Sequence, residues 1–247
     1  MKGCRPLTTQ EIISVSEQFT SRYEVRNSAL FILGISTGGR IAELLSLKIE
    51  DVWQGGQPVS DLFYEKNVVK GKENSRLIPV NSDAKQAIVE LVSWHKEQFG
   101  TVDPKRPLFP SRKGNDAIST TQGYRVLKDA FSLAGLNGKV ATHSMRKTYA
   151  QRLYDATGDI YLVAEALGHK AVETTKKYLG VSYDKLRRAS EEIELCNRTI
   201  LSLHSSLNDS DLILELAKRG WDISSIIDQL QEKEKRDAKI IKFPKAV

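Results

Sequence analysis

The chain has 247 residues, 40% of them hydrophobic and 28% charged, which fits a globular fold and excludes a disordered or fibrous chain. No apolar run approaches the roughly 18 residues of a membrane span, the N-terminus has no apolar signal core, and two cysteines exclude a disulfide scaffold. The net charge of +6 favours an acidic partner such as nucleic acid.

Capping signals and helical periodicity predict the first elements. Thr8 and Glu11 have the spacing of a capping box in front of an apolar-periodic stretch, so a helix starts there. Residues 25–36 read as a buried helix that the glycines at 38–39 stop. A short helix over residues 40–47 follows.

The periodicity then changes to that of strands. Residues 62–64, 68–69 and 77–80 form short β-like runs around a polar turn at 70–75. Helical periodicity returns over residues 83–99. We therefore expect one small antiparallel sheet inside a mostly helical domain.

The rest of the chain is predicted to be helical. The expected helices span residues 120–134, 143–156, 160–167, 172–179 and 184–207. After a linker at 208–210, two further helices at 212–218 and 223–231 are joined through Gly220. The predicted fold class is mainly α with a small antiparallel β-sheet (α+β). We expect one domain over residues 1–207 and a helical C-terminal appendage over 208–247, frayed in its charge-rich last residues.

Six side chains offer the chemistry of metal-free phosphodiester cleavage, which needs a nucleophile, donors for the phosphate oxygens and an acid for the leaving oxygen. Each has a structural reading when taken alone: a surface arginine or lysine, a capping histidine, or a core tyrosine. Their conjunction in helix starts, turns and helix ends favours function. The six are Arg40 in TGGRIAEL, Lys72 in VVKGK, His143 and Arg146 in HSMR, His169 in LGH, and Tyr178 in ETTKKYLG.

This ordered set resembles the signature of the tyrosine recombinases, the phage integrase family. The order Arg, Lys, His-x-x-Arg, His, Tyr and the nine-residue step from His169 to Tyr178 are similar to the Xer-type members. The resemblance covers residue 6 to about residue 186. It implies the tyrosine recombinase catalytic-domain fold.

The resemblance assigns roles around a scissile phosphate. Arg40 and Arg146 would hold its non-bridging oxygens with their planar guanidinium groups. Lys72 would protonate the departing 5′ oxygen as a general acid. Glu43, one turn after Arg40, would support that arginine.

The resemblance also implies a covalent intermediate. Tyr178 would attack the phosphorus and form a 3′-phosphotyrosine, without a metal, another cofactor or ATP. His143 and His169 would hydrogen-bond the phosphate and help to move the tyrosine's proton. Tyr183 is a rival nucleophile, but its distance from His169 fits the family pattern poorly.

The partners and the genetic origin follow from the same resemblance, and the cytoplasmic location from the lack of a signal core, a membrane-length apolar run and a disulfide framework. We expect double-stranded DNA with specific target sites, a homo-oligomer of four protomers on paired sites, and a cytoplasmic protein encoded by a bacterium, phage or plasmid. Family members donate a segment after the tyrosine to the next protomer, and residues 184–207 and 212–231 are the candidates here.

Two features of the sequence depart from the family pattern. The pattern begins within the first ten residues, so we expect no N-terminal clamp domain, and Gly39 replaces the usual leucine.

Two other functions remain open on the sequence. A type IB topoisomerase shares the nucleophile and the arginines, although the His-x-x-Arg pair and the LGH context favour a recombinase. A non-catalytic DNA-binding regulator on the same fold is a second alternative, against which the intact six-residue set argues. The appendage reads either as a sequence-reading helix-turn-helix or, more simply, as a packing or docking element.

Overall fold

The computed structural model describes residues 3–65, 75–112 and 116–179, with the side chain of Lys177 excepted, and seven single positions from 187 to 224. The chain divides into two compact units, Met1–Val181 and Ser182–Val247. In the second unit the described positions at 214, 217, 218 and 224 are helical, and Gly220 has a φ of 79°. The predicted boundary after residue 207 lies outside the described residues and stays a prediction.

Within the described residues, the first unit contains nine helices and four short strands. The helices are α1 (Thr9–Ser16), α2 (Glu24–Thr37), α3 (Ile41–Ser46), α4 (Ile49–Val52), α5 (Ser82–Phe99), α6 (Thr120–Leu133), α7 (Thr142–Thr157), α8 (Ile160–Leu167) and α9 (Val172–Tyr178). The strands are β1 (Trp53–Gln54), β2 (Gln57–Pro58), β3 (Asp61–Tyr64) and β4 (Arg76–Pro79). No helix in these ranges combines the length and the apolar character that crossing a bilayer requires.

Side-chain caps fix where several helices begin. Thr8 accepts a hydrogen bond from the amide of Glu11, whose carboxylate accepts one from the amide of Thr8, so the predicted capping box is confirmed. The side chains of Asn81, Ser119 and Asp159 cap α5, α6 and α8 by accepting hydrogen bonds from amides of the first turn, without the reciprocal bond of a capping box. These caps set the directions in which the helices enter the core.

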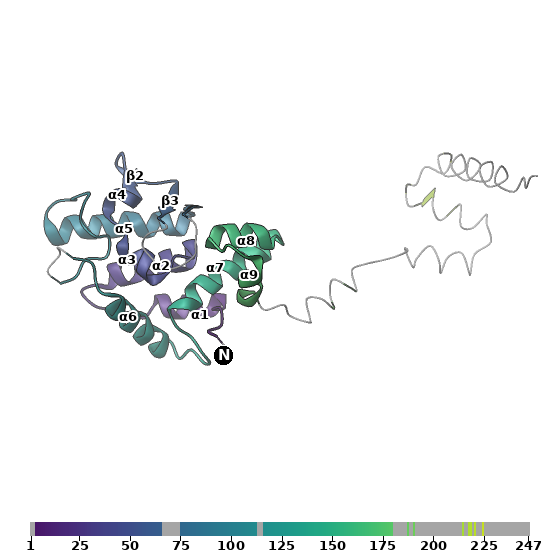
Figure 1. Ribbon diagram of the computed structural model, residues 1–247, viewed down its shortest axis with the longest axis horizontal. Helices are drawn as coiled ribbons and strands as arrows, with labels where there is room; N and C mark the ends of the chain where they lie inside the picture. Colours follow the sequence, from purple (N-terminus) through teal and green to yellow (C-terminus); the bar gives the residue numbers. More distant parts are fainter. Residues whose placement is uncertain are drawn as a thin grey trace, which may run out of the picture. The chain divides into compact units, whose positions relative to one another are not determined.

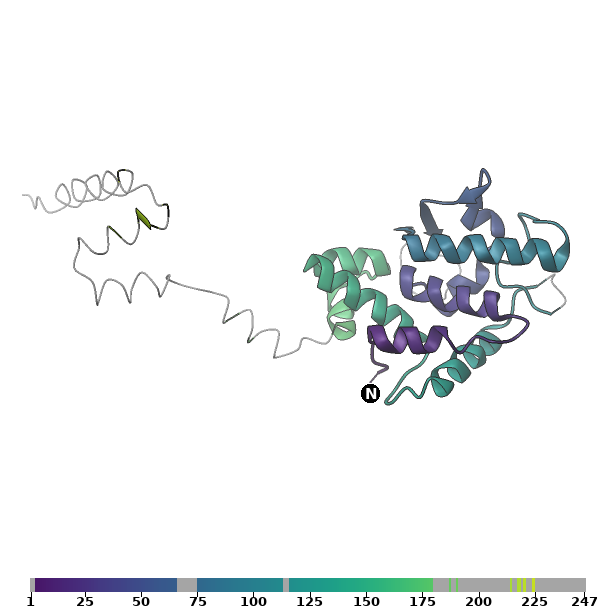
Figure 2. The same ribbon diagram turned by 180° about the vertical axis from the view of Figure 1, so that it is seen from behind.

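The helices surround α2, which lies beside α5 and crosses α7 (Figures 1 and 2). The main hydrophobic core takes Leu30, Phe31 and Leu33 from α2 and extends to Met145 at the start of α7. A second, smaller core joins α7, α8 and the end of α9, and consists of Ala150, Val163, Leu167 and Leu179. The three helices α7, α8 and α9 lie together at one side of the unit (Figure 1).

The strands form two antiparallel hairpins rather than the single sheet that the sequence predicted. In β3–β4, Leu62 pairs with Ile78 on the buried face and Phe63 pairs with Leu77 on the exposed face. The second hairpin, β1–β2, turns through Gly55 and Gly56, both at positive φ. It was missed because strands of two residues carry no alternation, although the Gly-Gly pair is a hairpin signal.

The helices predicted between residues 25 and 179 agree with the structure to within one or two residues at each end, and α1 begins at Thr9, directly after the predicted cap. One helix, α4, was not predicted, because it is a single turn of four residues and these are too few to show a helical period. Residues 68–69 and, apart from the single positions 187 and 190, residues 184–207 lie outside the described residues, so the strand and the helix predicted there stay predictions. The mainly α architecture with a small antiparallel component is confirmed.

Candidate active site

Arg40 stands at the start of α3, where the chain turns sharply out of α2. Gly38 ends α2 in the left-handed region with φ 65°, and a Cβ there would come within 2.5 Å of the Tyr149 ring, so this turn requires glycine. The backbone amide of Arg40 donates to Glu43 Oε2 at 2.6 Å, and its Nη1 lies 3.3 Å from Glu43 Oε1. The predicted support of Arg40 by Glu43 is therefore present in the geometry.

Glu43 has a second and stronger partner that sequence reasoning missed. Arg76, the first residue of β4, donates to Glu43 Oε1 at 2.9 Å and to Oε2 at 2.7 Å, a bidentate pair in which both side chains are 4% exposed. Burial alone would raise the pKa of the Glu43 carboxyl. The hydrogen bonds and charge of Arg76, together with the Arg40 amide and the charge of Arg146, outweigh burial and lower that pKa, so the carboxylate is ionised.

Arg146, on the second turn of α7, is 1% exposed. Its Nη1 donates to the Gly38 carbonyl at 2.8 Å, and its Nη2 donates to the Leu167 carbonyl at 2.5 Å. Burial, followed by the positive charges of Arg40 and Arg76, lowers the pKa of Arg146 to about 10. The guanidinium is still protonated at neutral pH, and it joins the end of α2 to the end of α8.

His169 follows Gly168, the left-handed residue that ends α8. Its Nε2 lies 3.3 Å from Arg146 Nη2, and its Nδ1 lies 2.9 Å from the hydroxyl of buried Thr175. Because the guanidinium only donates, Nε2 is the acceptor and the ring carries its proton on Nδ1. Burial and the charges of Arg146 and Arg40 lower the pKa of His169 to about 4, so the imidazole is neutral.

Tyr178 is the last residue of α9 and is half-buried. Its ring meets the ring of His169 edge to face, with 5.1 Å between centroids and 62° between planes. The ammonium of Lys147 lies 5.5 Å from the centre of the Tyr178 ring. The structure thus brings Arg146, His169 and Tyr178 into one contiguous group.

His143 occupies the first turn of α7, one turn before Arg146, as its spacing predicted. Its side chain is exposed. Partial desolvation of the ring and the charges of Arg146, Arg40 and Lys147 lower its pKa. The charge of Arg40 lowers the pKa values of His143, Arg146 and His169, so Arg40 lies close enough to these three side chains to act on them.

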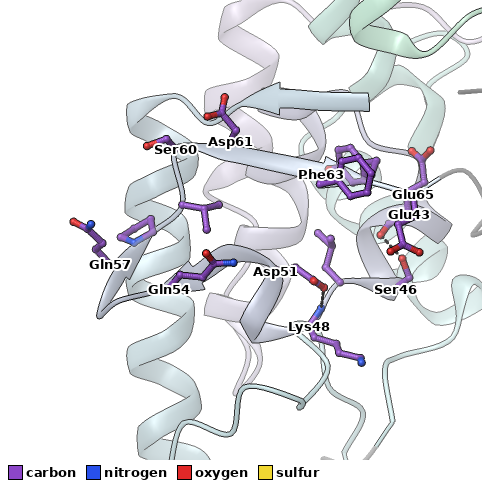
Figure 3. A pocket seen from close by; sticks show the side chains of 14 residues that line it. Glu43, Ser46, Lys48, Asp51, Gln54, Gln57, Ser60, Asp61, Phe63 and Glu65 are labelled. Atoms are coloured by element: carbon purple, nitrogen blue, oxygen red, sulfur yellow. Dashed lines mark hydrogen bonds between the residues drawn. The ribbon is translucent and has the colours of Figure 1, made fainter. Parts of the chain in front are cut away.

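Two sequence candidates lie outside the described residues: Lys72, predicted as the acid, and Tyr183, the rival nucleophile. Position 72 belongs to the segment that joins β3 to β4. A groove of about 590 Å³ runs along β3 beside the site (Figure 3). Its lining includes Asp51, Asp61 and Glu65, and Glu43 lies at the same end as Glu65 (Figure 3).

Gly39, the departure from the family pattern, has a local explanation. A Cβ at this position would come within 2.5 Å of the Tyr64 hydroxyl and 3.0 Å of Leu44. That hydroxyl hydrogen-bonds Thr37 at 2.7 Å, at the end of α2. In this chain a tyrosine from β3 therefore occupies the space that a larger residue at position 39 would need.

Comparisons with known proteins agree with this geometry. Residues 5–185 match the model of the phage integrase family. A probable integrase/recombinase, YoeC, of Bacillus subtilis is 31% identical over 185 residues, which cover 75% of this chain and 94% of that protein. Tyrosine recombinase XerC of Halalkalibacterium halodurans is 32% identical over 173 residues, or 68% of this chain and 54% of XerC.

A solved structure of XerH recombinase, bound to a palindromic difH substrate in a post-cleavage complex, shares the fold. Its TM-score is 0.62 at 24% identity, over 75% of this chain and 51% of that chain. The chain thus spans about half the length of the Xer proteins that it matches and nearly all of YoeC. On the family match and the YoeC similarity, this chain belongs to the phage integrase family of tyrosine recombinases.

Proposed function

We propose that this chain is a site-specific DNA recombinase that cleaves and rejoins strands through a 3′-phosphotyrosine, without a metal, another cofactor or ATP. The observation that carries the proposal is the contiguous group of Arg146, His169 and Tyr178. In it an anion-binding guanidinium contacts a neutral imidazole, which contacts a phenol. The proposed nucleophile, a proposed proton acceptor and a hydrogen-bond donor for the phosphate oxygens are thus neighbours, which supports their acting on one phosphorus atom.

The two arginines would bind the scissile phosphate. Arg146 is held by the carbonyl oxygens of Gly38 and Leu167, and Arg40 is oriented by Glu43, so both guanidinium groups are placed before substrate arrives. Such preorganised charge stabilises the pentacoordinate transition state without reorganisation. Desolvation strengthens this effect, since a buried cation interacts more strongly with an anion than an exposed one does.

The chemical step balances with the residues assigned to it. The Tyr178 oxygen bonds to phosphorus, the bond from phosphorus to the 5′ oxygen breaks, and that oxygen takes a proton from Lys72. The phenol's proton passes to His143 or His169, which are neutral because their pKa values are lowered. His169 would take it on Nε2, in exchange for its contact with Arg146. The phosphotyrosine ester conserves the bond energy, so a 5′ hydroxyl from another strand reverses the step.

The partners proposed are double-stranded DNA with specific sites and further copies of this chain. The XerH relative is described on a DNA substrate, and the net charge of +6 suits a polyanion. A ring of four protomers on paired sites would supply the second strand. The alternatives are not favoured, because the relatives are named integrases and recombinases rather than topoisomerases or regulators.

The decisive experiment is covalent trapping on a nicked suicide substrate that carries the target site. The protein should form a DNA adduct, in excess EDTA as well as without it, and Tyr178→Phe should lose the adduct while DNA binding persists. Tyr183→Phe is the matched control and should keep the adduct. An adduct in the Tyr178→Phe protein, or its loss in the Tyr183→Phe protein, contradicts the assignment.

A further inference from the structure

Arg76 is a buried cation beside the proposed phosphate site, with two short bonds to Glu43. Glu43 in turn bonds the backbone and side chain of Arg40. We propose that Arg76 is a positioning residue: it holds Glu43 in its ionised form, and ionised Glu43 holds Arg40 in place for the scissile phosphate. This inference rests on the proposed function and adds a residue to it.

The charges explain why a carboxylate beside the phosphate arginines needs Arg76. A carboxylate that is 4% exposed is costly unless it is paired and fully hydrogen-bonded. If Arg40 were its main partner, Glu43 would cancel the charge that the phosphate requires. Arg76 instead makes the two short contacts and Arg40 Nη1 the longer one, at 3.3 Å. The Arg76–Glu43 pair is neutral as a whole, so Glu43 can hold Arg40 while most of its own charge is balanced by Arg76.

The β3–β4 hairpin, which carries Arg76, also contacts the groups that hold Arg146 in place. The Arg76 guanidinium stacks 4.6 Å from the centre of the Tyr64 ring, on the neighbouring strand β3. The Tyr64 hydroxyl bonds Thr37, and the next residue, Gly38, gives its carbonyl to Arg146. The Tyr64–Arg76 pair, at the loop end of the β3–β4 hairpin, is thus connected to the supports of both arginines.

This arrangement predicts a specific pH dependence. The groups that face Glu43 are Arg40 at the start of α3, Arg76 on β4, Tyr64 on β3 and Arg146 on α7, and Glu65 lies at the same end of the groove. Burial favours the neutral carboxyl, and Arg76 is the largest influence that opposes it. Without Arg76 the pKa of Glu43 rises. At pH values below that raised pKa, the neutral carboxyl loses its charge-assisted hold on Arg40.

The test compares Arg76→Met with Arg26→Met. Arg26 is a matched control, because it is also buried and stacks 4.4 Å from a tyrosine ring, but bonds Asn27 and the Pro110 carbonyl away from the site. The rate of adduct formation at saturating protein is measured from about pH 5.5 to 9. For Arg76→Met we expect a rate roughly 10²-fold below wild type at the acid end, the size of effect typical of misplacing a catalytic group by about 1 Å. The deficit should shrink as pH rises, whereas Arg26→Met should follow the wild-type profile.

Two further variants keep the proposal open to refutation. Arg76→Lys retains the positive charge but not the bidentate guanidinium, so its rate of adduct formation at acid pH should fall in the same way but by less. This variant replaces Arg76→Met in the test if Arg76→Met does not fold. In a Glu43→Gln background nothing titrates at position 43, so adding Arg76→Met should change neither the pH profile nor, beyond about twofold, the rate.

The outcomes separate this inference from the proposed function. If wild-type protein forms no adduct, the proposed function is wrong. If wild type forms the adduct and a folded Arg76 variant keeps the wild-type pH profile, the positioning role is wrong while the function stands. Full additivity of Arg76→Met with Glu43→Gln would also overturn it, because Arg76 would then act on its own.

Discussion

The proposed phosphate-binding side of the site and its nucleophile side rest on hydrophobic cores of very different size. Arg40 and Glu43 belong to the start of α3, which packs on the main core through Leu44 and Leu45. His169 and Tyr178 depend on α8 and the seven-residue α9, whose core, within the part of the chain that the structure describes, contains four buried residues including Ala150 of α7. Arg146 spans both sides, since it bonds the end of α2 and the end of α8.

This difference matches what each side must do. Charges that stabilise a transition state work best when they are fixed in advance, and the buried Arg76–Glu43 pair fixes them. A nucleophile must approach the phosphorus and later leave it, which a short helix with little apolar burial permits at lower free-energy cost. His169 limits that freedom through its contacts with Arg146, Thr175 and Tyr178.

The largest expected effect separates charge stabilisation from proton donation on the phosphate side. Arg40→Ala and Lys72→Ala should each slow cleavage of normal DNA by about 10²- to 10³-fold. A 5′-bridging phosphorothiolate has a leaving group that needs no acid, so it should restore cleavage by Lys72→Ala. Arg40→Ala should stay slow, because the phosphate's charge is unchanged. Equal rescue of both variants would remove the distinction between the two roles.

The sequence predicted the residues that a short motif can carry. Arg40, His143, His169 and Tyr178 stand at helix starts and ends, as the pattern indicated, and Arg146 stands on the second turn of α7. The structure places Arg146, His169 and Tyr178 in contact. Their catalytic roles stay predictions. Helix positions were accurate because capping residues and glycines mark helix ends locally.

The residues that the sequence did not reveal act through tertiary contacts. Arg76 lies 33 positions from Glu43, and nothing in the local pattern of a four-residue strand distinguishes it from a surface arginine. Tyr64 and Gly39 are complementary only because β3 crosses the end of α2. Thr175 had a weak signal, since it lies one turn before Tyr178 on the same helix face.

An intermediate effect is expected on the nucleophile side, from Thr175. Its hydroxyl accepts the Nδ1 proton of His169 and so fixes the tautomer that presents Nε2 as the acceptor. Thr175→Val removes that acceptor with little change in shape and should slow adduct formation roughly tenfold, about the free energy of one hydrogen bond. Thr175→Ser should restore most of the rate, which a purely packing role would not explain.

The control for Thr175 is its neighbour Thr174, which is exposed on the same helix. Thr174→Val tests whether a β-branched apolar residue at this point of α9 is harmful in itself. Its adduct rate should match wild type. If Thr175→Val also matched wild type, His169 would not depend on this contact for its orientation, and the nucleophile side would be held by packing alone.

The smallest expected effect is a loss of folding stability at acid pH, which arises on the nucleophile side of the site. The folded-state pKa of His169 is about 4, below the ordinary value of 6.5. As the pH falls, the unfolded chain therefore protonates this imidazole at a higher pH than the folded chain does. Stability contributed by the neutral ring is therefore complete above about pH 6.5 and falls as pH drops towards 4. At pH 5 the loss through His169 should be about 1 kcal/mol, discounted for the ring's partial exposure.

Urea unfolding of the full chain at pH 7.5 and pH 5 measures that loss. His169→Gln should unfold more easily at both pH values, since it gives up the contacts of the imidazole, but the difference between the two pH values should shrink. Some difference will remain, because burial also lowers the pKa of His95, whose Nε2 lies 2.9 Å from the Leu108 carbonyl inside the main core. An unchanged pH difference in His169→Gln would mean that the imidazole is not held neutral by the folded protein. The acid sensitivity would then come from other groups, such as His95 in the main core and His143 on α7, whose pKa values are also lowered.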